Sequence, residues 1–322
     1  MSAVVRPWPE SSSWAQCQKL FCAHLVFTVV LQVISADLPF QQAHSKFNRS
    51  SKKFVSAVVK PLIVSPTQTP RLLVSVRNSD EARAAIAGGC DILDIKEPHR
   101  GSLGMADPDV TAQIIETTRN LDRSLPVSAA LGEVVDWSIG PNGISAVPSC
   151  FEDCTFLKIG CAGLRSQPEW RTELSETRQA VTSSLSNPPS WVAVAYADWE
   201  AADAPKVSDV VRAALHDKCC GVLIDTFTKS NRWLLDWITL NELHAIADQV
   251  HSHGLFLALA GSLNAADLPR LKPVDVDILA IRGAACLQGQ RQSEISQAAV
   301  RAFQQRISAI WPLAPASSGK TA

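Results

Sequence analysis

The chain has 322 residues, of which 46% are hydrophobic and 19% are charged. This composition is typical of a globular protein with a large buried core, and it excludes a disordered or fibrous chain. The formal net charge is −1, so no overall positive field favours nucleic acid or an anionic membrane surface. Any anionic substrate must therefore be bound by a local group of side chains.

Residues 1–70 are interpreted as an N-terminal extension that is disordered or arises from a start codon upstream of the native one. They contain serine clusters and one apolar run, at 20–34. At about fifteen residues, that run is shorter than the roughly twenty that a membrane-spanning helix needs. It resembles the core of an export signal only weakly. We therefore expect no membrane association.

From residue 71 onward, short apolar runs alternate with amphipathic stretches. Their continuous hydrophobicity, rather than strict alternation, is typical of parallel strands that are buried on both faces. The runs predict eight strands, at 72–76, 92–95, 127–131, 156–159, 191–195, 221–224, 255–260 and 278–281. The intervening segments predict helices at 80–87, 110–118, 169–185, 207–215, 240–253 and 294–310, with a short one at 265–271. The connection at 139–152 contains glycine and proline and is the weakest helix prediction.

Strand number and chain length together indicate the fold. Eight strands that alternate with helices over about 240 residues match a single (β/α)8 TIM barrel. We expect this catalytic domain over residues 71–312 and a disordered tail over 313–322. Ser79 is the predicted N-cap of the first helix, which Gly88 and Gly89 should end. The alternative, a doubly wound open sheet, normally has a glycine-rich turn after its first strand, but residues 76–79 contain no glycine.

Polar residues at strand ends are the candidates for chemistry, because barrel enzymes place their active sites at the carboxyl ends of the strands. Three of the six lysines within 71–312 end or closely follow a strand: Lys96, Lys158 and Lys229. A lysine in a buried strand is costly unless it is paired or functional. Salt bridges to Asp94 or Asp225 would explain one such lysine, but three that converge on one rim favour a functional site.

Convergence of these lysines has a chemical consequence. Ammonium groups that lie close together and partly out of water disfavour the charged form, which lowers their pKa and frees an amine nucleophile. Asp94 lies two residues before Lys96, so both side chains should point to the same side of the strand. It could transfer protons or hold the amine, and Asp225 offers a second carboxylate. This combination is typical of imine formation, enolisation and aldol-type bond formation.

Small residues that follow the last two strands predict a phosphate site. Gly261 and Ser262 end the seventh strand, and Arg282, Gly283 and Ala284 end the eighth. The loops at these two positions are the usual phosphate-binding loops of the TIM barrel, where backbone N–H groups can approach an anion. Together with the lysines, these loops predict a small phosphorylated carbonyl compound as the substrate.

No cofactor or metal site is expected from the remaining residues. His244, His251 and His253 lie on or near one predicted helix, and a surface position is favoured over a metal site. The nine cysteines include no C-x-x-C pair, which favours buried reduced thiols and a cytoplasmic location. The sequence leaves open whether the barrel forms a homo-oligomer.

The second predicted strand and its loop, Asp94-Ile-Lys96-Glu-Pro98-His-Arg-Gly101-Ser-Leu-Gly104, resemble the (5-formylfuran-3-yl)methyl phosphate synthase family. These archaeal enzymes begin the furan unit of methanofuran. The likeness covers about residues 71–307 and continues in chain order through Val127-Ser-Ala, Leu157-Lys-Ile-Gly160, Ala195-Tyr-Ala-Asp198, Ile224-Asp-Thr226 with Lys229, Leu259-Ala-Gly-Ser262 and Ile281-Arg-Gly-Ala-Ala-Cys286.

The resemblance implies a barrel that condenses two molecules of glyceraldehyde 3-phosphate to a furan aldehyde phosphate, with loss of one phosphate and water. It further implies that Lys96 is the Schiff-base lysine and Lys158 the proton acceptor, with Asp94, Asp225 and Lys229 assisting. Two places depart from the family pattern. Glu133 stands where an Asp follows Gly, and residues 288–291 lack an expected acidic residue. Both concern the rim of the substrate site rather than the imine centre.

Two other functions fit the same residues. A different lysine-dependent aldolase would use Lys96 and the phosphate site on another sugar phosphate, without releasing inorganic phosphate. A non-catalytic barrel could instead bind a phosphorylated ligand or a partner protein. Incubation with glyceraldehyde 3-phosphate distinguishes the three.

Overall fold

The computed structural model describes residues 69–137, 147–229 and 232–312. Residues 1–68 of the predicted extension and the predicted tail at 313–322 lie outside this described part. Within it, no helix is long and apolar enough to cross a membrane.

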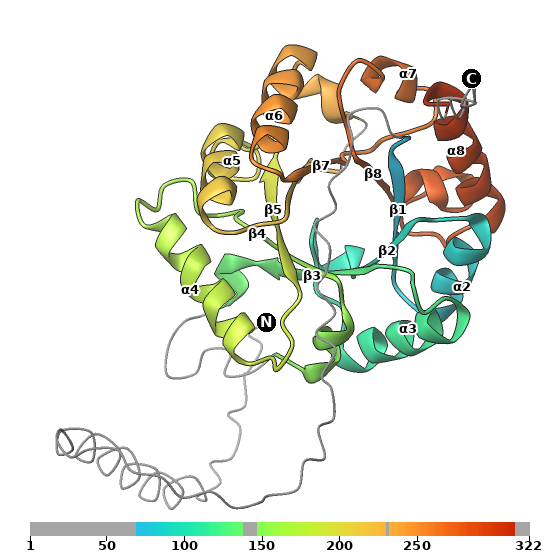
Figure 1. The fold of residues 1–322 in the computed structure, drawn as a ribbon, viewed down its shortest axis with the longest axis horizontal. Helices are drawn as coiled ribbons and strands as arrows, with labels where there is room; N and C mark the ends of the chain where they lie inside the picture. Colours follow the sequence, from blue (N-terminus) through green and yellow to red (C-terminus); the bar gives the residue numbers. More distant parts are fainter. Residues whose placement is uncertain (1–68, 138–146, 230–231, 313–322) are drawn as a thin grey trace, which may run out of the picture. The chain divides into compact units, whose positions relative to one another are not determined.

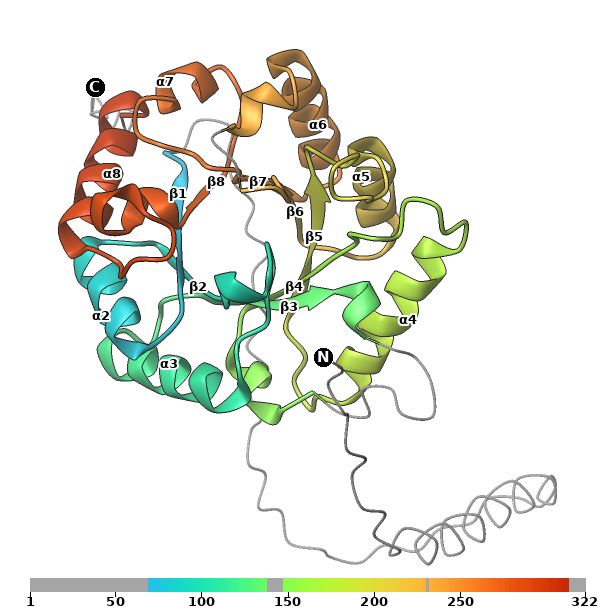
Figure 2. The same cartoon turned by 180° about the vertical axis from the view of Figure 1, so that it is seen from behind.

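Eight parallel strands pair in chain order, and β8 closes the ring by pairing with β1 (Figures 1 and 2). The bounds are β1 (Arg71–Val76), β2 (Ile92–Ile95), β3 (Val127–Glu133), β4 (Phe156–Gly160), β5 (Ser190–Tyr196), β6 (Gly221–Asp225), β7 (Phe256–Leu259) and β8 (Ile278–Ile281). Every predicted strand is present, within two residues at either end. The closed ring confirms the predicted TIM barrel and rules out the doubly wound sheet.

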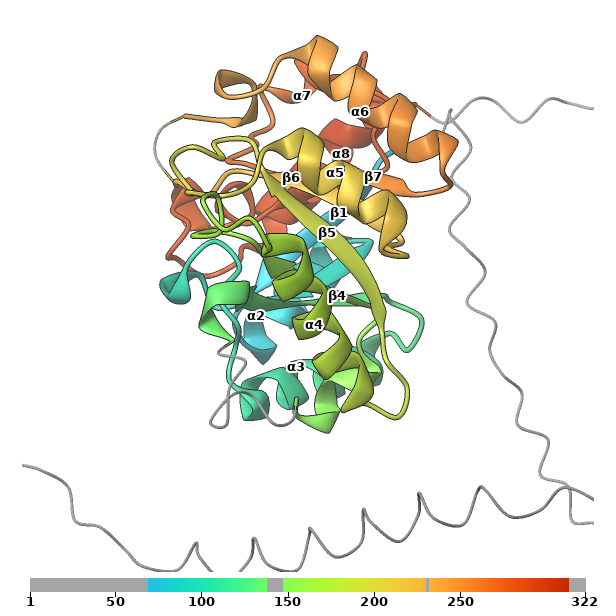
Figure 3. The same cartoon turned by 90° about the vertical axis from the view of Figure 1, so that its left-hand side faces the viewer.

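Helices surround the barrel, and the side view in Figure 3 shows α4, α5 and α6 on the outer face of its strands. The helices of the described residues are α2 (Ser79–Gly88), α3 (Pro108–Leu121), α4 (Trp170–Ser183), α5 (Val207–His216), α6 (Leu240–Ser252), α7 (Leu268–Leu271) and α8 (Gln297–Ile310). In the weakly predicted connection at 139–152, residues 139–146 lie outside the described part. The connection then ends in a 3-10 turn, Ser149–Asp153.

The start of α2 differs from the prediction. Asn78, not Ser79, is the N-cap, and its side-chain oxygen accepts a hydrogen bond from Glu81 N at 2.9 Å. The reason is that Asn78 still has the extended backbone of the preceding strand, which an N-cap residue requires, whereas Ser79 is already helical. The predicted end is confirmed, because Gly89 adopts a φ of 91° and donates to carbonyls of the last turn.

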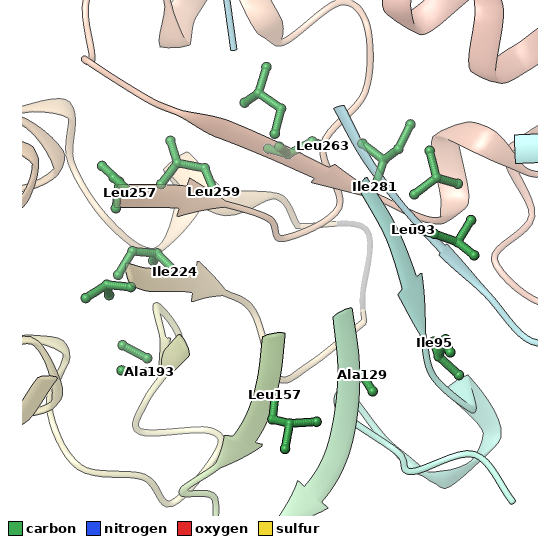
Figure 4. Close-up of a cluster of buried hydrophobic side chains, with 14 of the residues drawn as sticks. Leu93, Ile95, Ala129, Leu157, Ala193, Ile224, Leu257, Leu259, Leu263 and Ile281 are labelled. Atoms are coloured by element: carbon green, nitrogen blue, oxygen red, sulfur yellow. The ribbon is translucent and has the colours of Figure 1, made fainter. Parts of the chain in front are cut away.

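The buried side chains form two layers that follow the alternation along each strand. One layer packs the strands against the helices, and Figure 4 shows several of its members, Leu93 and Ile95 among them. The other layer fills the barrel interior and includes Ile92, so Asp94, two residues later, also points inward. Full burial of a leucine or isoleucine contributes roughly 1.5–3 kcal/mol. Because side chains alternate along a strand, burial of the outer-layer residues also keeps the charged residues between them pointing into the barrel.

Candidate active site at the carboxyl ends of the strands

A cavity of about 310 Å³ opens at the carboxyl ends of the strands, a size that suits a small ligand. Its walls come from β1, β2, β4 and β6 and from the loops that follow β7 and β8. All the residues predicted from the sequence line this one cavity: Asp94, Lys96, Lys158, Asp225, Lys229, Gly261, Ser262, Arg282, Gly283 and Ala284. Residues far apart in the chain are thus brought together as the strand-end pattern predicted.

Lys158 and Asp94 form a buried ion pair across the barrel interior. Lys158 Nζ lies 2.5 Å from Asp94 Oδ1, and both side chains are almost fully buried. The β1–β2 register places Ser75 opposite Asp94, where its hydroxyl donates to Asp94 Oδ2 at 2.8 Å. Both carboxylate oxygens are therefore engaged. Asp94 holds Lys158 rather than its sequence neighbour Lys96, although the sequence placed Asp94 beside Lys96.

A second pair joins Lys229 to Asp225. Lys229 Nζ donates to Asp225 Oδ1 at 3.0 Å and also to the carbonyl of Thr226. Burial alone would raise the pKa of Asp225, but Lys229 and then Lys96 outweigh it and lower the pKa to about 2. Asp225 is therefore ionised at neutral pH. Burial lowers the pKa of Lys229, and the Asp225 charge opposes that change.

Lys96 differs from the other two lysines because no described carboxylate forms an ion pair with it. Its buried Nζ donates a hydrogen bond to the carbonyl oxygen of Ser102 at 3.1 Å. Burial and then the nearby charge of Arg291 lower its pKa from 10.5 to about 7, while Asp225 and Asp94 act in the opposite direction. A neutral, nucleophilic amine is therefore accessible to Lys96 near neutral pH.

The loop after β2 brings Ser102 to Lys96. Ser102 and Leu103 are buried, and the Ser102 hydroxyl donates to the Thr226 carbonyl at 3.2 Å. Gly101 has a φ of 113°, and a Cβ on Gly104 would lie 2.2 Å from the Glu97 carbonyl oxygen, so both positions require glycine. The loop is therefore shaped to present its backbone to the amine. No sequence pattern indicated this role for Ser102, because a serine between glycines resembles any turn.

Arg282 lines the cavity, but its guanidinium is held in an internal ion pair rather than presented to a ligand. Its Nη1 donates to Glu81 Oε2 and to the Ser75 carbonyl, each at 2.9 Å, and the side chain is 1% exposed. Its Nε donates to the carbonyl of Arg291 at 2.9 Å. Arg291, nine residues beyond Arg282, was not predicted and lines the same cavity. It lies in a loop, where no periodic pattern could have pointed to it.

Small residues shape the wall of the cavity that follows β7 and β8. Gly261 and Ser262 both have left-handed backbones, with φ of 97° and 55°. A Cβ on Gly261 would lie 2.9 Å from Thr226 Cγ2, so a larger residue would not fit without displacement. Gly283 and Ala284 begin a 3-10 turn at the end of β8. Small side chains add little bulk to this wall, and the phosphate site predicted here stays a prediction.

Glu133, one of the two departures from the family pattern, is half-buried at the end of β3. Its carboxylate accepts hydrogen bonds from Tyr196 Oη at 2.5 Å and from Ala162 N at 2.9 Å. Burial raises the pKa of Glu133, and burial together with Glu133 raises that of Tyr196. A Cβ on Gly160 would lie 2.0 Å from Glu133 Oε2, so glycine makes room for the longer carboxylate. Neither Glu133 nor Tyr196 lines the cavity.

None of the histidines in the described part of the chain lines this cavity. His251 pairs with Asp277 at 2.8 Å and with Asp275 at 3.4 Å, and His244 contacts the Pro273 carbonyl. Across the residues that the structure describes, no three His, Cys, Asp or Glu side chains gather in a way that could hold a metal ion.

Comparisons with known proteins identify the same family as the motif at residues 94–104. The (5-formylfuran-3-yl)methyl phosphate synthase of Methanococcus maripaludis strain C7 is 34% identical over 220 residues, which is 68% of this chain and 91% of that protein. The enzymes of the same name from Methanopyrus kandleri and Methanocaldococcus jannaschii are each 34% identical over 222 residues, 69% of this chain and 92% of theirs.

Among solved structures, KGPDC from Streptococcus mutans matches 76% of this chain and 100% of its own, with 16% identity and a TM-score of 0.47. The family model described as 4-HFC-P synthase matches residues 72–304, which is nearly the whole barrel. The chain therefore belongs to the 4-HFC-P synthase family, the family that its sequence motifs predicted.

Proposed function

We propose that this barrel condenses two molecules of glyceraldehyde 3-phosphate to (5-formylfuran-3-yl)methyl phosphate, through an imine on Lys96. The observation that carries the proposal is the state of Lys96. It is a buried lysine without an ion-pair partner among the described residues, with a pKa of about 7, in a cavity lined by two further lysines. The names of the relatives support the product, and the small-residue wall suits a phosphate.

The first step uses the neutral amine of Lys96. Its lone pair attacks the substrate carbonyl carbon, and the resulting carbinolamine loses water to give an iminium ion. The hydrogen bond to the Ser102 carbonyl orients the amine before attack. The iminium withdraws electrons from the adjacent carbon, so its C–H proton becomes acidic and an enamine can form.

Lys158 then accepts that proton. Because its ammonium is paired with Asp94, it must first give up a proton of its own, and the 2.5 Å hydrogen bond to Asp94 supplies the acceptor. The enamine attacks the carbonyl of the second substrate molecule and forms the new carbon–carbon bond. Lys229, paired with Asp225, donates protons as one phosphate and, in the overall balance, two molecules of water leave. Hydrolysis of the imine then releases the product and the Lys96 amine. Condensation, ring closure and these losses involve no net oxidation or reduction, so the proposal includes no redox cofactor.

Incubation of the purified protein with glyceraldehyde 3-phosphate tests the reaction. A furan absorbance together with free inorganic phosphate supports it. An aldol product without free phosphate would favour a different lysine-dependent aldolase, and the absence of any turnover would favour a ligand-binding barrel. We place the reaction in the cytoplasm, a proposal that rests on the cysteine usage alone.

Borohydride reduction in the presence of substrate tests the nucleophile. We expect a covalent adduct on Lys96, with a trapping rate that rises with pH and levels off above about pH 7, because only the neutral amine reacts. An adduct that maps to Lys158 or Lys229 would overturn the assignment.

A further inference from the structure

Arg291 has a buried nitrogen without a partner. Its Nη2 is excluded from solvent and forms no hydrogen bond with any residue that the structure describes. A buried guanidinium N–H without an acceptor is rare and costly, and it calls for an explanation. The side chain lines the cavity, and its Cβ lies 4.0 Å from where a Cβ on Gly283 would be. Arg291 thus starts beside the small-residue wall.

The charges around the cavity are unevenly matched. Three of its cations have carboxylate partners within the described residues: Lys158 with Asp94, Lys229 with Asp225, and Arg282 with Glu81. Lys96 and Arg291 have none, and Lys96 must be neutral to react. A guanidinium keeps its proton throughout the neutral range, so Arg291 provides the permanent unmatched positive charge. An anionic ligand in the cavity would provide the counter-charge that the described residues do not provide.

Arg282 fixes the backbone of Arg291 while leaving its side chain unengaged. The Arg282 guanidinium, anchored by Glu81, donates to the Arg291 carbonyl at 2.9 Å and to the Ser293 carbonyl at 3.4 Å. Within the same loop, Leu287 N donates to the Glu294 carbonyl at 2.9 Å. The loop is therefore held on both sides of Arg291, as a preorganised binding residue requires.

We propose that Arg291 binds the substrate phosphate and so selects phosphorylated over unphosphorylated aldehydes. The proposal rests on the proposed function for the identity of the substrate. The planar guanidinium can form paired hydrogen bonds to phosphate oxygens, with the wall at Gly261 and Gly283 close by. Arg282, which was predicted from the sequence to bind the phosphate, is instead a positioning residue that acts by holding Arg291.

The test compares the wild type with Arg291→Ala and Arg291→Lys, and uses Arg306→Ala, on the exposed face of α8, as the control. Borohydride trapping on Lys96 is measured with glyceraldehyde 3-phosphate and with glyceraldehyde, which lacks the phosphate. We expect Arg291→Ala to reduce trapping efficiency with the phosphorylated aldehyde by about 10- to 100-fold relative to glyceraldehyde, the range of one or two charge-assisted hydrogen bonds. Arg291→Lys should recover part of this preference, and Arg306→Ala should keep all of it.

Binding of inorganic phosphate, measured by calorimetry, gives a readout that is independent of turnover. Its affinity should fall in Arg291→Ala by a similar factor. The proposal would be overturned if Arg291→Ala prefers glyceraldehyde 3-phosphate over glyceraldehyde as strongly as the wild type does and binds phosphate with unchanged affinity. If Arg291→Ala does not fold, the fallback is to modify the wild-type protein with phenylglyoxal, which reacts with arginine, in the presence and absence of phosphate. Phosphate should slow the modification of Arg291, and an equal rate under both conditions would overturn the proposal.

The two proposals can fail separately. If the wild type makes no furan but binds phosphate through Arg291, the reaction is refuted and the role of Arg291 is supported. If Arg291→Ala makes furan with the wild-type KM, the role of Arg291 is refuted and the reaction is supported.

Discussion

Replacing Lys96 with methionine should stabilise the protein while it abolishes imine formation. Methionine has a similar length and no charge, so it suits a position that is only 6% exposed. The pKa of Lys96 is about 7 in the folded protein, against an ordinary 10.5. Each tenfold change in proton affinity is worth about 1.4 kcal/mol, so the folded surroundings as a whole disfavour the charged amine by about 5 kcal/mol below pH 7.

The sign of the pH dependence follows from proton binding. Between pH 7 and 10.5 the unfolded chain binds more protons at this lysine than the folded protein does, so this contribution makes wild-type stability rise with pH. Lys96→Met has no such group. Its advantage over the wild type should therefore be largest at pH 6 and should shrink steadily as the pH approaches 10.

Urea unfolding, followed by circular dichroism at several pH values between 6 and 9, measures this difference. Lys272→Met, at an exposed position, is the matched control, and it should change stability by no more than about 0.5 kcal/mol at any pH. The reasoning is refuted if Lys96→Met is no more stable than the wild type at pH 6, or if its advantage does not narrow with pH.

Three further predictions concern residues that form or support the site. Lys158→Arg keeps its charge beside Asp94 but should lose most furan formation, because a guanidinium does not give up its proton near neutral pH; near wild-type turnover would remove Lys158 from proton transfer. Gly104→Ala should lower both the melting temperature and the Lys96 trapping rate, because the added Cβ meets the Glu97 carbonyl; unchanged trapping would separate this loop from the amine. Glu81→Gln should destabilise the fold by about 3–5 kcal/mol in urea unfolding, because it leaves Arg282 buried without a counter-charge. A loss below about 0.5 kcal/mol would show that water or another group compensates Arg282.

The fold was readable from the sequence because a parallel strand buried on both faces needs a continuous apolar run, whichever strand it pairs with. The runs at 92–95 and 278–281 match β2 and β8 to the residue. Alternation along β2 also predicted that Asp94 and Lys96 would point to the same side of the strand, and both line the cavity. Helix ends were less certain, and the cap fell on Asn78 rather than Ser79 because both residue types can cap.

Side-chain partners could not be predicted in the same way. Asp94 reaches Lys158, 64 residues away, because strand tilt and register bring β2 and β4 together inside the barrel. The residues near Asp94 in the sequence do not indicate which distant strand will face it. The same limit explains why the prediction chose Arg282 and missed Arg291. Arg282, at the strand end, is paired with Glu81, whereas Arg291, in a loop, lines the cavity without an ion-pair partner among the described residues. Alternation gives the direction of a strand side chain, but it says nothing of a loop residue.

The cavity takes its three lysines and its small-residue wall from different parts of the barrel. Lys158 lies on β4, Lys96 follows β2 and Lys229 follows β6, whereas Gly261 and Arg291 lie in the loops beyond β7 and β8. Those loops could be exchanged in the laboratory without altering the strands that carry the lysines. Directed evolution could then recruit the same reactive amine for aldehydes with other acidic groups, such as carboxylates or sulfonates.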